Sequence, residues 1–321
     1  MSPPANMGLL AGPAGGIRLE PRPMPRAPGP DDVVVRMLLA PVNPADLLAV
    51  DGGYAFALAA DEPLGAEGVG IVEQLGSRVA DLRSGDLVLP LDRGNWARYR
   101  VLPRDRLLAV PSGIDLPQAA MMRINPATAW LLLDGSGAGP GDCIVQNAAG
   151  SAVAHWVRRL AALRDVMVID VVRPGSSFTG LADDERLEAA VRKASGGRPV
   201  RAALDCVAGD STGRMAACLD ADGIVLVFGH LSGDPSRVRS QLLTGRGLTV
   251  RGFSLRPAEA KMVPAARDKM VAALWTLAGQ GAADLPIRAV LPLAEADQAI
   301  ALARTPGPGR VLLDLDAISG M

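Results

Sequence analysis

The stretch CIVQNAAGSAVAHWVRRLA, from Cys143 to Ala161, decides the fold, because a short apolar strand passes through a turn of very small residues into an amphipathic helix. Gly150, Ser151, Ala152 and Ala154 carry little or no side chain, so a pyrophosphate could approach the backbone at the positive end of the helix. This layout is typical of a dinucleotide site. The usual fingerprint has three glycines and this turn keeps one, so a turn that merely packs a helix on a strand is the alternative.

Length and charge narrow the classes of function. The chain has 321 residues, enough for about two domains. Its 33 basic and 34 acidic residues nearly cancel, so we expect small molecules as partners, with no nucleic acid and no membrane. The N-terminal residues lack a basic segment followed by an apolar core, and we expect a soluble cytoplasmic protein. The three cysteines are an odd number and are expected to be packing residues.

The pattern of apolar runs changes near residue 120. Before it, runs separated by Gly, Pro and Asp turns predict a β-rich domain with strands at Val33–Leu39, Gly68–Leu75, Asp86–Pro90 and Trp96–Val101. After it, strands alternate with helices, which predicts an α/β fold with a doubly wound parallel sheet. The expected strands are Cys143–Gln146, Val166–Val172, Ala202–Cys206 and Ile224–Phe228, and the expected helices are Ala152–Leu163, Asp184–Ala194 and Thr212–Leu219.

The end of the chain is expected to return to the first domain. A long helix is predicted over Ala258–Ala278, and the strand Val311–Leu315 would then complete the β-rich domain. We therefore predict a β-rich domain of residues 1–120 and 285–321, and a dinucleotide-binding domain of residues 121–284.

Several strings resemble one known family. The order of β-rich domain, nucleotide domain and returning C-terminus is similar to the medium-chain dehydrogenase/reductase superfamily, which implies a Rossmann domain and a GroES-like catalytic domain. Within it, the chain resembles the mitochondrial-type trans-2-enoyl-thioester reductases, and the zinc-free quinone oxidoreductases share several of the same features. The strings are NPADLLAVDGGY (Asn43–Tyr54), INPATAW (Ile124–Trp130), IVQNAAGSAV (Ile144–Val153), DVVR (Asp170–Arg173), DCVAGDST (Asp205–Thr212) and RGFSL (Arg251–Leu255).

The superfamily contains zinc alcohol dehydrogenases and zinc-free reductases, which differ in their metal ligands. Where the zinc enzymes place a cysteine before an aspartate, this chain has Asn43 and Pro44; where they place His before Glu, it reads Gly65, Ala66 and Glu67. Residues 80–120 contain no cysteine that could form a four-cysteine lobe. We therefore predict no metal site.

Without a metal, another group must polarise a carbonyl and manage a proton. Tyr54 follows two glycines in a loop, whereas the other tyrosine, Tyr99, lies in a strand-like segment. The enoyl-thioester reductases carry their catalytic tyrosine at the position of Tyr54. The resemblance thus implies a phenol that donates a hydrogen bond or a proton to the substrate. From the residues alone, a surface or interface tyrosine fits equally well.

The end of the second strand of the nucleotide domain bears on the choice of cofactor. Arg173 follows this strand, and a cation there favours the phosphate of NADP, whereas a carboxylate favours the ribose of NAD. We predict NADPH, because Asp170 lies three residues earlier, inside the strand; a solvated arginine at a strand end is the alternative. By resemblance, the cofactor site also includes Asn125, Gly150, Ser151, Ala152, Val153, Phe228, Gly229, His230, Leu231, Phe253, Ser254, Leu255 and Arg310.

The chain also departs from the pattern of the enoyl reductases. Ser254 stands where they usually carry tryptophan, Ala152 and Ala154 replace glycines, and the region after Arg173 is shorter. Each departure alters the pocket that the resemblance implies.

These expectations combine into one hypothesis. The chain reduces the C=C bond of a 2-enoyl thioester, carried by CoA or acyl carrier protein, by hydride transfer from NADPH to the β carbon. The alternatives are a zinc-free NADPH quinone or alkenal reductase acting on a free enone, and a non-catalytic member of the fold. We expect a homodimer, for which LTVRGFSL from Leu248 is a candidate edge strand; an interior strand is the alternative.

Overall fold

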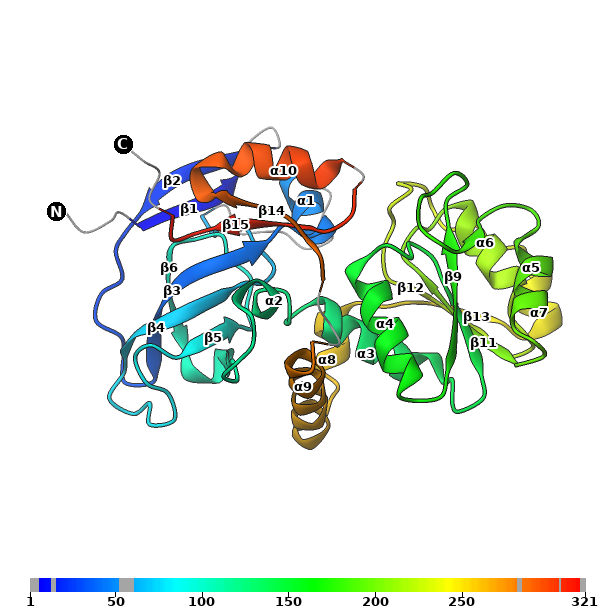
Figure 1. The fold of residues 1–321 in the computed structure, drawn as a ribbon, viewed down its shortest axis with the longest axis horizontal. Helices are drawn as coiled ribbons and strands as arrows, with labels where there is room; N and C mark the ends of the chain where they lie inside the picture. The colour runs from blue at the N-terminus through cyan, green and yellow to red at the C-terminus, as the bar shows by residue number, and fades with distance from the viewer. Residues whose placement is uncertain (1–5, 13–15, 52–60, 282–284, 306, 318–321) are drawn as a thin grey trace. The chain divides into compact units, whose positions relative to one another are not determined.

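The computed structural model describes residues 6–12, 16–51, 61–281, 285–305 and 307–317. The chain divides into two compact units (Figure 1). The β-rich unit comprises Met1–Ile124 and Asp284–Met321, and the α/β unit comprises Asn125–Ala283.

Within its described residues, the β-rich unit is built on a seven-stranded sheet. The strand order is β14-β15-β3-β4-β5-β7, with β6 paired to β3, and β1 and β2 form a separate antiparallel pair. The elements are β1 (Asn6–Ala11), β2 (Ile17–Arg22), β3 (Asp32–Pro41), α1 (Pro44–Val50), β4 (Val69–Leu75), β5 (Leu87–Pro90), β6 (Tyr99–Pro103), β7 (Leu107–Ala109), α2 (Leu116–Ala119), β14 (Ile287–Pro292), α10 (Ala296–Arg304) and β15 (Arg310–Asp314).

The core of this unit is centred on the long strand β3. Val33, Val35 and Met37 alternate along it and are fully buried, as expected for one face of a strand against a core. The returning C-terminal strand β15 pairs antiparallel with β3 and parallel with β14. The end of the chain therefore supplies a strand to this sheet.

Within its described residues, the α/β unit has a six-stranded sheet in the order β10-β9-β8-β11-β12-β13, and every neighbouring pair is parallel. Numbered from β8, this is the order 3-2-1-4-5-6 of a doubly wound dinucleotide-binding fold, so the predicted fold class is confirmed. The elements are α3 (Asn125–Ser136), β8 (Cys143–Gln146), α4 (Ala152–Ala162), β9 (Met167–Val172), β10 (Leu181–Ala182), α5 (Leu187–Ala194), β11 (Val200–Asp205), α6 (Asp210–Ala217), β12 (Ile224–Val227), α7 (Ser240–Arg246), β13 (Thr249–Gly252), α8 (Leu255–Glu259) and α9 (Pro264–Gly279).

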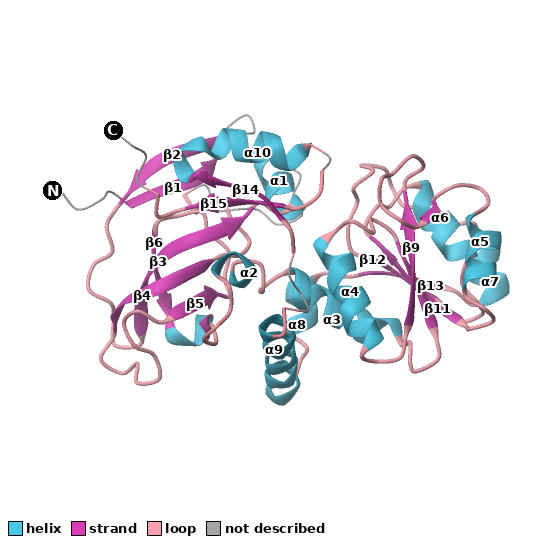
Figure 2. Cartoon of the chain, viewed as in Figure 1, coloured by secondary structure: helices cyan, strands magenta, loops and turns pink. Residues whose placement is uncertain are grey.

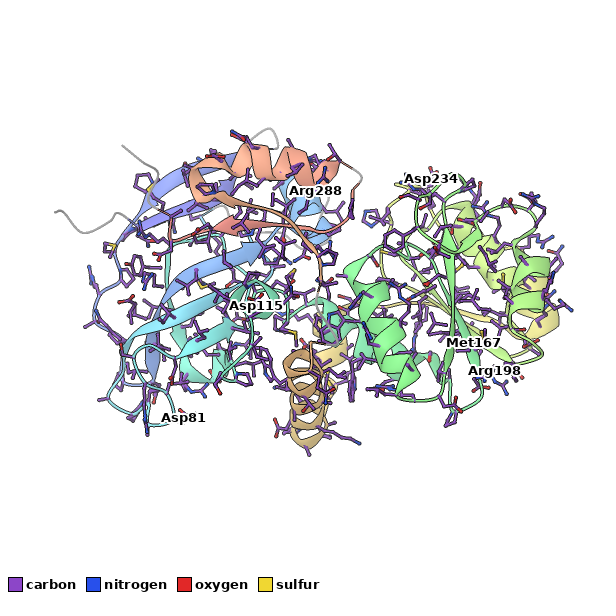
Figure 3. The ribbon with its side chains drawn as sticks, in the orientation of Figure 1. Asp81, Asp115, Met167, Arg198, Asp234 and Arg288 are labelled. Atoms are coloured by element: carbon purple, nitrogen blue, oxygen red, sulfur yellow. The ribbon has the colours of Figure 1, made fainter. Side chains whose placement is uncertain are left out.

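Helices cover both faces of this sheet. Figures 1 and 2 show α3 and α4 on one side of the strands and α5 and α6 on the other. The two ends of the sheet are marked in Figure 3, where Met167 and Arg198 lie at the end at which strands begin and Asp234 lies in a loop at the opposite end. Ligands of open α/β sheets bind at the carboxyl ends of the strands, the end marked by Asp234.

Three local expectations differ from the structure. The predicted helix Ala258–Ala278 is two helices, α8 and α9, because Pro264 cannot continue a helix and instead begins a new one. The strand expected at Trp96 begins at Tyr99, and Trp96 itself is fully buried. The pair β1 and β2 lies in the Pro- and Gly-rich start, where no strand was predicted.

Two further expectations are that the cysteines are packing residues and that the chain has no membrane partner. The three cysteines form no disulfide in the described part of the chain, and burial raises the pKa of Cys143 to about 11 and that of Cys218 to about 12, as expected of packing residues. Among the described residues, no helix combines the length and the apolar character that a membrane span requires.

Candidate functional site

The turn between β8 and α4 forms the centre of the candidate site. Ser151 caps α4, and its side chain accepts a hydrogen bond from Ala154 N at 3.1 Å. Ala152 and Ala154 are both 2% exposed, so their methyl groups are buried and do not cover the exposed side of the turn. Gly150 is exposed, and a Cβ at this position would lie 2.9 Å from Phe178 Cε2, so a larger residue would displace that ring.

The backbone beside this turn is held by a buried network between the ends of β8 and β11. Asn147 Nδ2 donates to Asp205 Oδ1 at 2.6 Å, and Asn147 Oδ1 accepts from Cys206 N at 2.7 Å. Asp205 also accepts from Thr212 Oγ1 at 2.6 Å and from the backbone N–H groups of two residues in the following turn, Val207 and Ala208. The strand order reverses here, so this network fixes the backbone at the position where doubly wound folds bind dinucleotides.

The other loops predicted for the cofactor site lie at the same edge of the sheet. Phe228 N donates to Asp205 O at 2.8 Å and Leu231 N to Cys206 O at 3.1 Å, so the loop Phe228–Leu231 packs on the turn after β11. Phe253 N donates to Val227 O at 2.8 Å, and Ser254 precedes α8 as its exposed N-cap residue. Most of the predicted cofactor residues are therefore brought together at one edge.

Two charged groups lie at the carboxyl end of β9, and their surroundings differ. Arg173 follows the strand, is exposed, and its guanidinium makes no hydrogen bond or ion pair to the described residues. Asp170 lies inside the strand and accepts from Arg158 NH1 at 2.9 and 3.0 Å and from Gln146 Nε2 at 2.7 Å. The cation is therefore available to a ligand, whereas the carboxylate is already engaged.

Two other predicted residues belong to α3 and β15, and a third lies outside the described residues. Asn125 is buried and begins α3 in the α/β unit. Arg310 is half-buried at the first residue of β15, in the β-rich unit, where its N–H donates to Pro286 O. Tyr54 lies outside the residues that the structure describes.

The β-rich unit contains a buried acidic cluster of its own. Glu67 is fully buried and accepts from Asn43 Nδ2 at 2.9 Å and from the backbone N–H groups of Arg123 and Ile124 at 3.0 and 2.8 Å. Burial raises the pKa of Glu67 to about 7, although these hydrogen bonds oppose the shift. Glu67 thus holds the segment immediately before Asn125.

Asp46 belongs to the same cluster. Its side chain is fully buried, accepts from Asn43 N at 3.0 Å and from Ala66 N at 2.8 Å, and lies 3.2 Å from Arg93 NH2. Burial raises the pKa of Asp46 to about 6, and Arg93 opposes this shift. Among the described residues, no group of three or more His, Cys, Asp or Glu side chains is placed to hold a metal ion.

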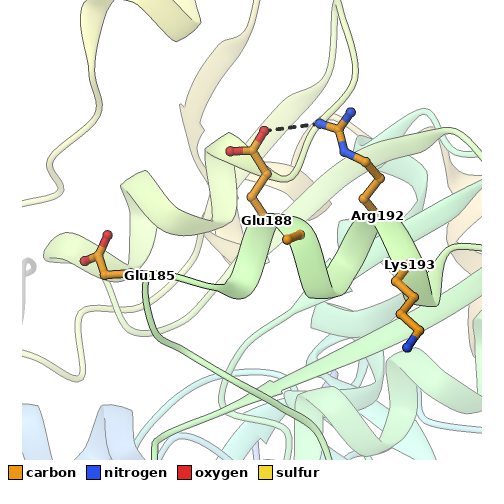
Figure 4. Close-up of a pocket in the computed structure, with 5 residues that line it drawn as sticks. Glu185, Glu188, Arg192 and Lys193 are labelled. Atoms are coloured by element: carbon orange, nitrogen blue, oxygen red, sulfur yellow. Dashed lines mark hydrogen bonds and ion pairs between the residues drawn. The ribbon is translucent and has the colours of Figure 1, made fainter.

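A shallow depression also lies beside α5 (Figure 4). It measures about 500 Å³ and is lined by charged side chains, with Glu188 paired to Arg192 at 3.3 Å. None of the predicted cofactor residues lines it, and its charges are those of a solvated helix face. We assign it no function.

The residues that sequence reasoning missed share one property, which is contact across elements. Their side chains form hydrogen bonds with partners distant in sequence; they are Arg158, Gln146, Asn147, Asp205 and Glu67. The sequence carries one signal for Asp170, the partner of Arg158 and Gln146. Asp170 follows Gly150 by roughly 20 residues, the spacing between the glycines and the ribose-binding acid in dinucleotide folds.

Comparisons with known proteins agree with this architecture. Residues 29–112 match the alcohol dehydrogenase GroES-like domain, and residues 179–307 match the zinc-binding dehydrogenase family. The mitochondrial enoyl-[acyl-carrier-protein] reductase of Xenopus tropicalis is 33% identical over 87% of this chain and 85% of its own length. The protein of that name from Homo sapiens is 31% identical over 86% of this chain and 78% of its own length.

Solved structures share the fold. A complex of Etr1p with NADP and crotonyl-CoA has a TM-score of 0.85 at 21% identity and covers 97% of this chain and 99% of that one. The Escherichia coli quinone oxidoreductase complexed with NADPH has a TM-score of 0.82 at 21% identity and covers 96% and 99%.

The comparisons also correct one expectation. The cytoplasmic location expected from the N-terminal residues is wrong, because the curated relatives are named as mitochondrial proteins. The prediction rested on the pattern of a secretory signal, which does not report on import into an organelle.

Identity above 30% across most of both chains, together with the doubly wound sheet and the GroES-like match, shows a family relationship. The chain belongs to the medium-chain dehydrogenase/reductase superfamily, in the zinc-free branch that contains the mitochondrial-type enoyl-thioester reductases.

Proposed function

We propose that this oxidoreductase reduces the C=C bond of a 2-enoyl thioester, carried by CoA or acyl carrier protein, with NADPH as the cofactor. The observation that carries the proposal is the likeness to enoyl-[acyl-carrier-protein] reductases over more than four-fifths of the chain. The arrangement at the carboxyl edge of the α/β sheet supports it, because this edge combines a small-residue turn at a helix N-terminus with an exposed cation.

The described residues fit a nicotinamide nucleotide. The exposed turn at Gly150 and the first N–H groups of α4 suit a pyrophosphate, and the buried methyl groups of Ala152 and Ala154 leave that turn open. Arg173 suits the additional phosphate of NADPH, because its guanidinium is exposed and engaged by no described residue. When bound, the reduced nicotinamide supplies the hydride that adds to the β carbon.

We assign the role of hydrogen-bond or proton donor to Tyr54. As hydride adds to the β carbon, negative charge develops on the thioester oxygen, and a phenol can donate a hydrogen bond there or a proton to the α carbon. An unperturbed tyrosine has a pKa near 10 and holds its proton at neutral pH, as a donor must. The support is the match between NPADLLAVDGGY and the family's string that ends in its catalytic tyrosine.

A quinone or alkenal reductase is the second candidate. The fold likeness to a quinone oxidoreductase supports it, as does the small exposed Ser254, which stands where the enoyl reductases usually carry a tryptophan.

We also propose a homodimer that forms along β13. This strand is at the edge of the six-stranded sheet, and all four of its residues, Thr249–Gly252, are exposed. An exposed edge offers unpaired backbone groups to the same edge of a second copy. Light scattering of the purified protein that gives the mass of one chain would contradict this assembly.

The experiment that tests the function is a substrate panel with NADPH. Initial rates of NADPH oxidation are measured with crotonyl-CoA, a longer 2-enoyl-CoA and a quinone at matched concentrations. We expect a higher kcat/KM for an enoyl thioester. A preference for the quinone would favour the second candidate, and NADPH binding without turnover of any substrate would favour a non-catalytic role.

A further inference from the structure

The carboxylate of Asp170 occupies a position that is usually associated with NAD. It follows Gly150 by roughly 20 residues, and it is paired in register with Gln146, the last residue of β8. An acidic side chain at this position in dinucleotide folds binds the ribose hydroxyl groups, which would favour NADH. The nucleotide proposed above is NADPH, so the structure must contain something that counteracts Asp170.

Arg158 on α4 is the group that does so. Its NH1 atom lies 2.9 Å from Asp170 Oδ1 and 3.0 Å from Oδ2, so one nitrogen is shared between both carboxylate oxygens. Gln146 Nε2 adds a third hydrogen bond to Oδ1 at 2.7 Å. The side chains of Asp170 and Arg158 are 21% and 33% exposed, so the pair is partly buried. A charged hydrogen bond is stronger in such a partly buried position than at an open surface.

The same guanidinium also holds the phosphate-binding turn. Arg158 NH1 donates to Ala149 O at 3.1 Å, and Ala149 directly precedes Gly150. This geometry follows from the helix, because side chains of α4 lean towards its N-terminus, where the turn lies. Arg158 therefore links the turn to the end of β9 and cancels the negative charge between them.

We propose that Arg158 sets the nucleotide preference of this chain by withdrawing Asp170 from ribose recognition, which leaves Arg173 to select the phosphate of NADPH. This inference rests on the proposed function, because it concerns the same nucleotide site. Without Arg158, an uncompensated carboxylate would repel the 2′-phosphate and accept hydrogen bonds from the ribose hydroxyl groups of NADH.

The test measures dissociation constants of NADPH and NADH for the purified protein by titration calorimetry, without substrate. In Arg158→Met, the NADPH constant is expected to rise about tenfold while the NADH constant stays equal or falls, because the uncompensated carboxylate of Asp170 repels the 2′-phosphate. Arg159→Met is the matched control, because Arg159 is the exposed neighbour on α4, and it should keep the wild-type ratio. A ratio in Arg158→Met within twofold of wild type would overturn the inference.

Asp170→Asn tests the same claim should Arg158→Met fail to fold, which circular dichroism would reveal. Because the carboxylate is already engaged, this substitution should leave NADH affinity within twofold of wild type. A tenfold loss of NADH affinity would identify Asp170 as a ribose ligand and overturn the inference while leaving the reductase function intact. Failure of the wild-type protein to bind either nucleotide would overturn both proposals.

Discussion

Two carboxylates, Glu67 in the β-rich unit and Asp170 in the α/β unit, have different surroundings. In the β-rich unit, Glu67 is fully buried and receives hydrogen bonds from the amide of Asn43 and from backbone N–H groups, and its pKa rises to about 7. In the α/β unit, Asp170 is partly exposed and receives the guanidinium of Arg158. Burial among neutral donors therefore favours the protonated form of Glu67, whereas the carboxylate of Asp170 is engaged by a cation.

This difference matches the task that we propose for each unit. The β-rich unit would supply a proton donor to a substrate on which charge appears only during the reaction. The α/β unit would bind a cofactor whose phosphates are always charged, so it uses cations and a helix N-terminus. Each prediction below changes one group on one side of this comparison.

The largest effect is expected from Tyr54→Phe, which removes the proposed neutral donor. Loss of a donor to developing negative charge lowers kcat on the order of 10²–10³-fold, about 3 to 4 kcal/mol, in other enzymes. NADPH binding should be unchanged, and Tyr99→Phe, in strand β6, serves as the control for loss of a phenol. Full turnover by Tyr54→Phe would remove this residue from the mechanism.

The next effect concerns Asp205, the buried carboxylate of the α/β unit that also receives neutral donors. Asp205→Ala leaves Thr212 Oγ1, Asn147 Nδ2 and two backbone N–H groups without this acceptor, and should lower the free energy of unfolding by about 3 kcal/mol. The free energy of unfolding is measured by urea denaturation, with tryptophan fluorescence as the signal. Asp210→Ala removes an exposed ion pair with Arg237 and should lower the free energy of unfolding far less. Equal losses in the two variants would show that the network contributes no more than a surface pair.

A smaller effect is expected for the pH dependence of stability through Glu67. Its pKa in the fold is about 7, above the ordinary 4.5, so between these values the folded chain keeps a proton that the unfolded chain releases. The free energy of unfolding should therefore fall as pH rises through this interval and then level off. Asp46 should add a fall between pH 3.8 and about 6.

Glu67→Gln removes the titrating group and should flatten the upper part of this interval, from pH 6 to 7. The measurement is urea denaturation at a series of pH values. An unchanged slope in Glu67→Gln would assign the pH dependence to another group.

The sequence predicted the alternation of strands and helices after residue 120 because strand and helix periods and small-residue turns are local properties. It did not predict the break at Pro264, since the apolar pattern continues through that proline, nor β1 and β2, whose residues lie among glycines and prolines. The edge of the candidate site was predictable, because the carboxyl ends of parallel strands meet there. The pairing of Arg158 with Asp170 was not, because it depends on how α4 packs against β9.

The central claim is that the α/β unit selects NADPH through the exposed Arg173, while the carboxylate of Asp170 is paired with Arg158. The most direct measurement is the pair of dissociation constants for NADPH and NADH, in the wild-type protein and in Arg173→Ala. We expect the wild-type protein to prefer NADPH, and Arg173→Ala to weaken NADPH about tenfold, near 1.4 kcal/mol, without changing NADH. A wild-type preference for NADH, or equal loss of both nucleotides in Arg173→Ala, would contradict this account.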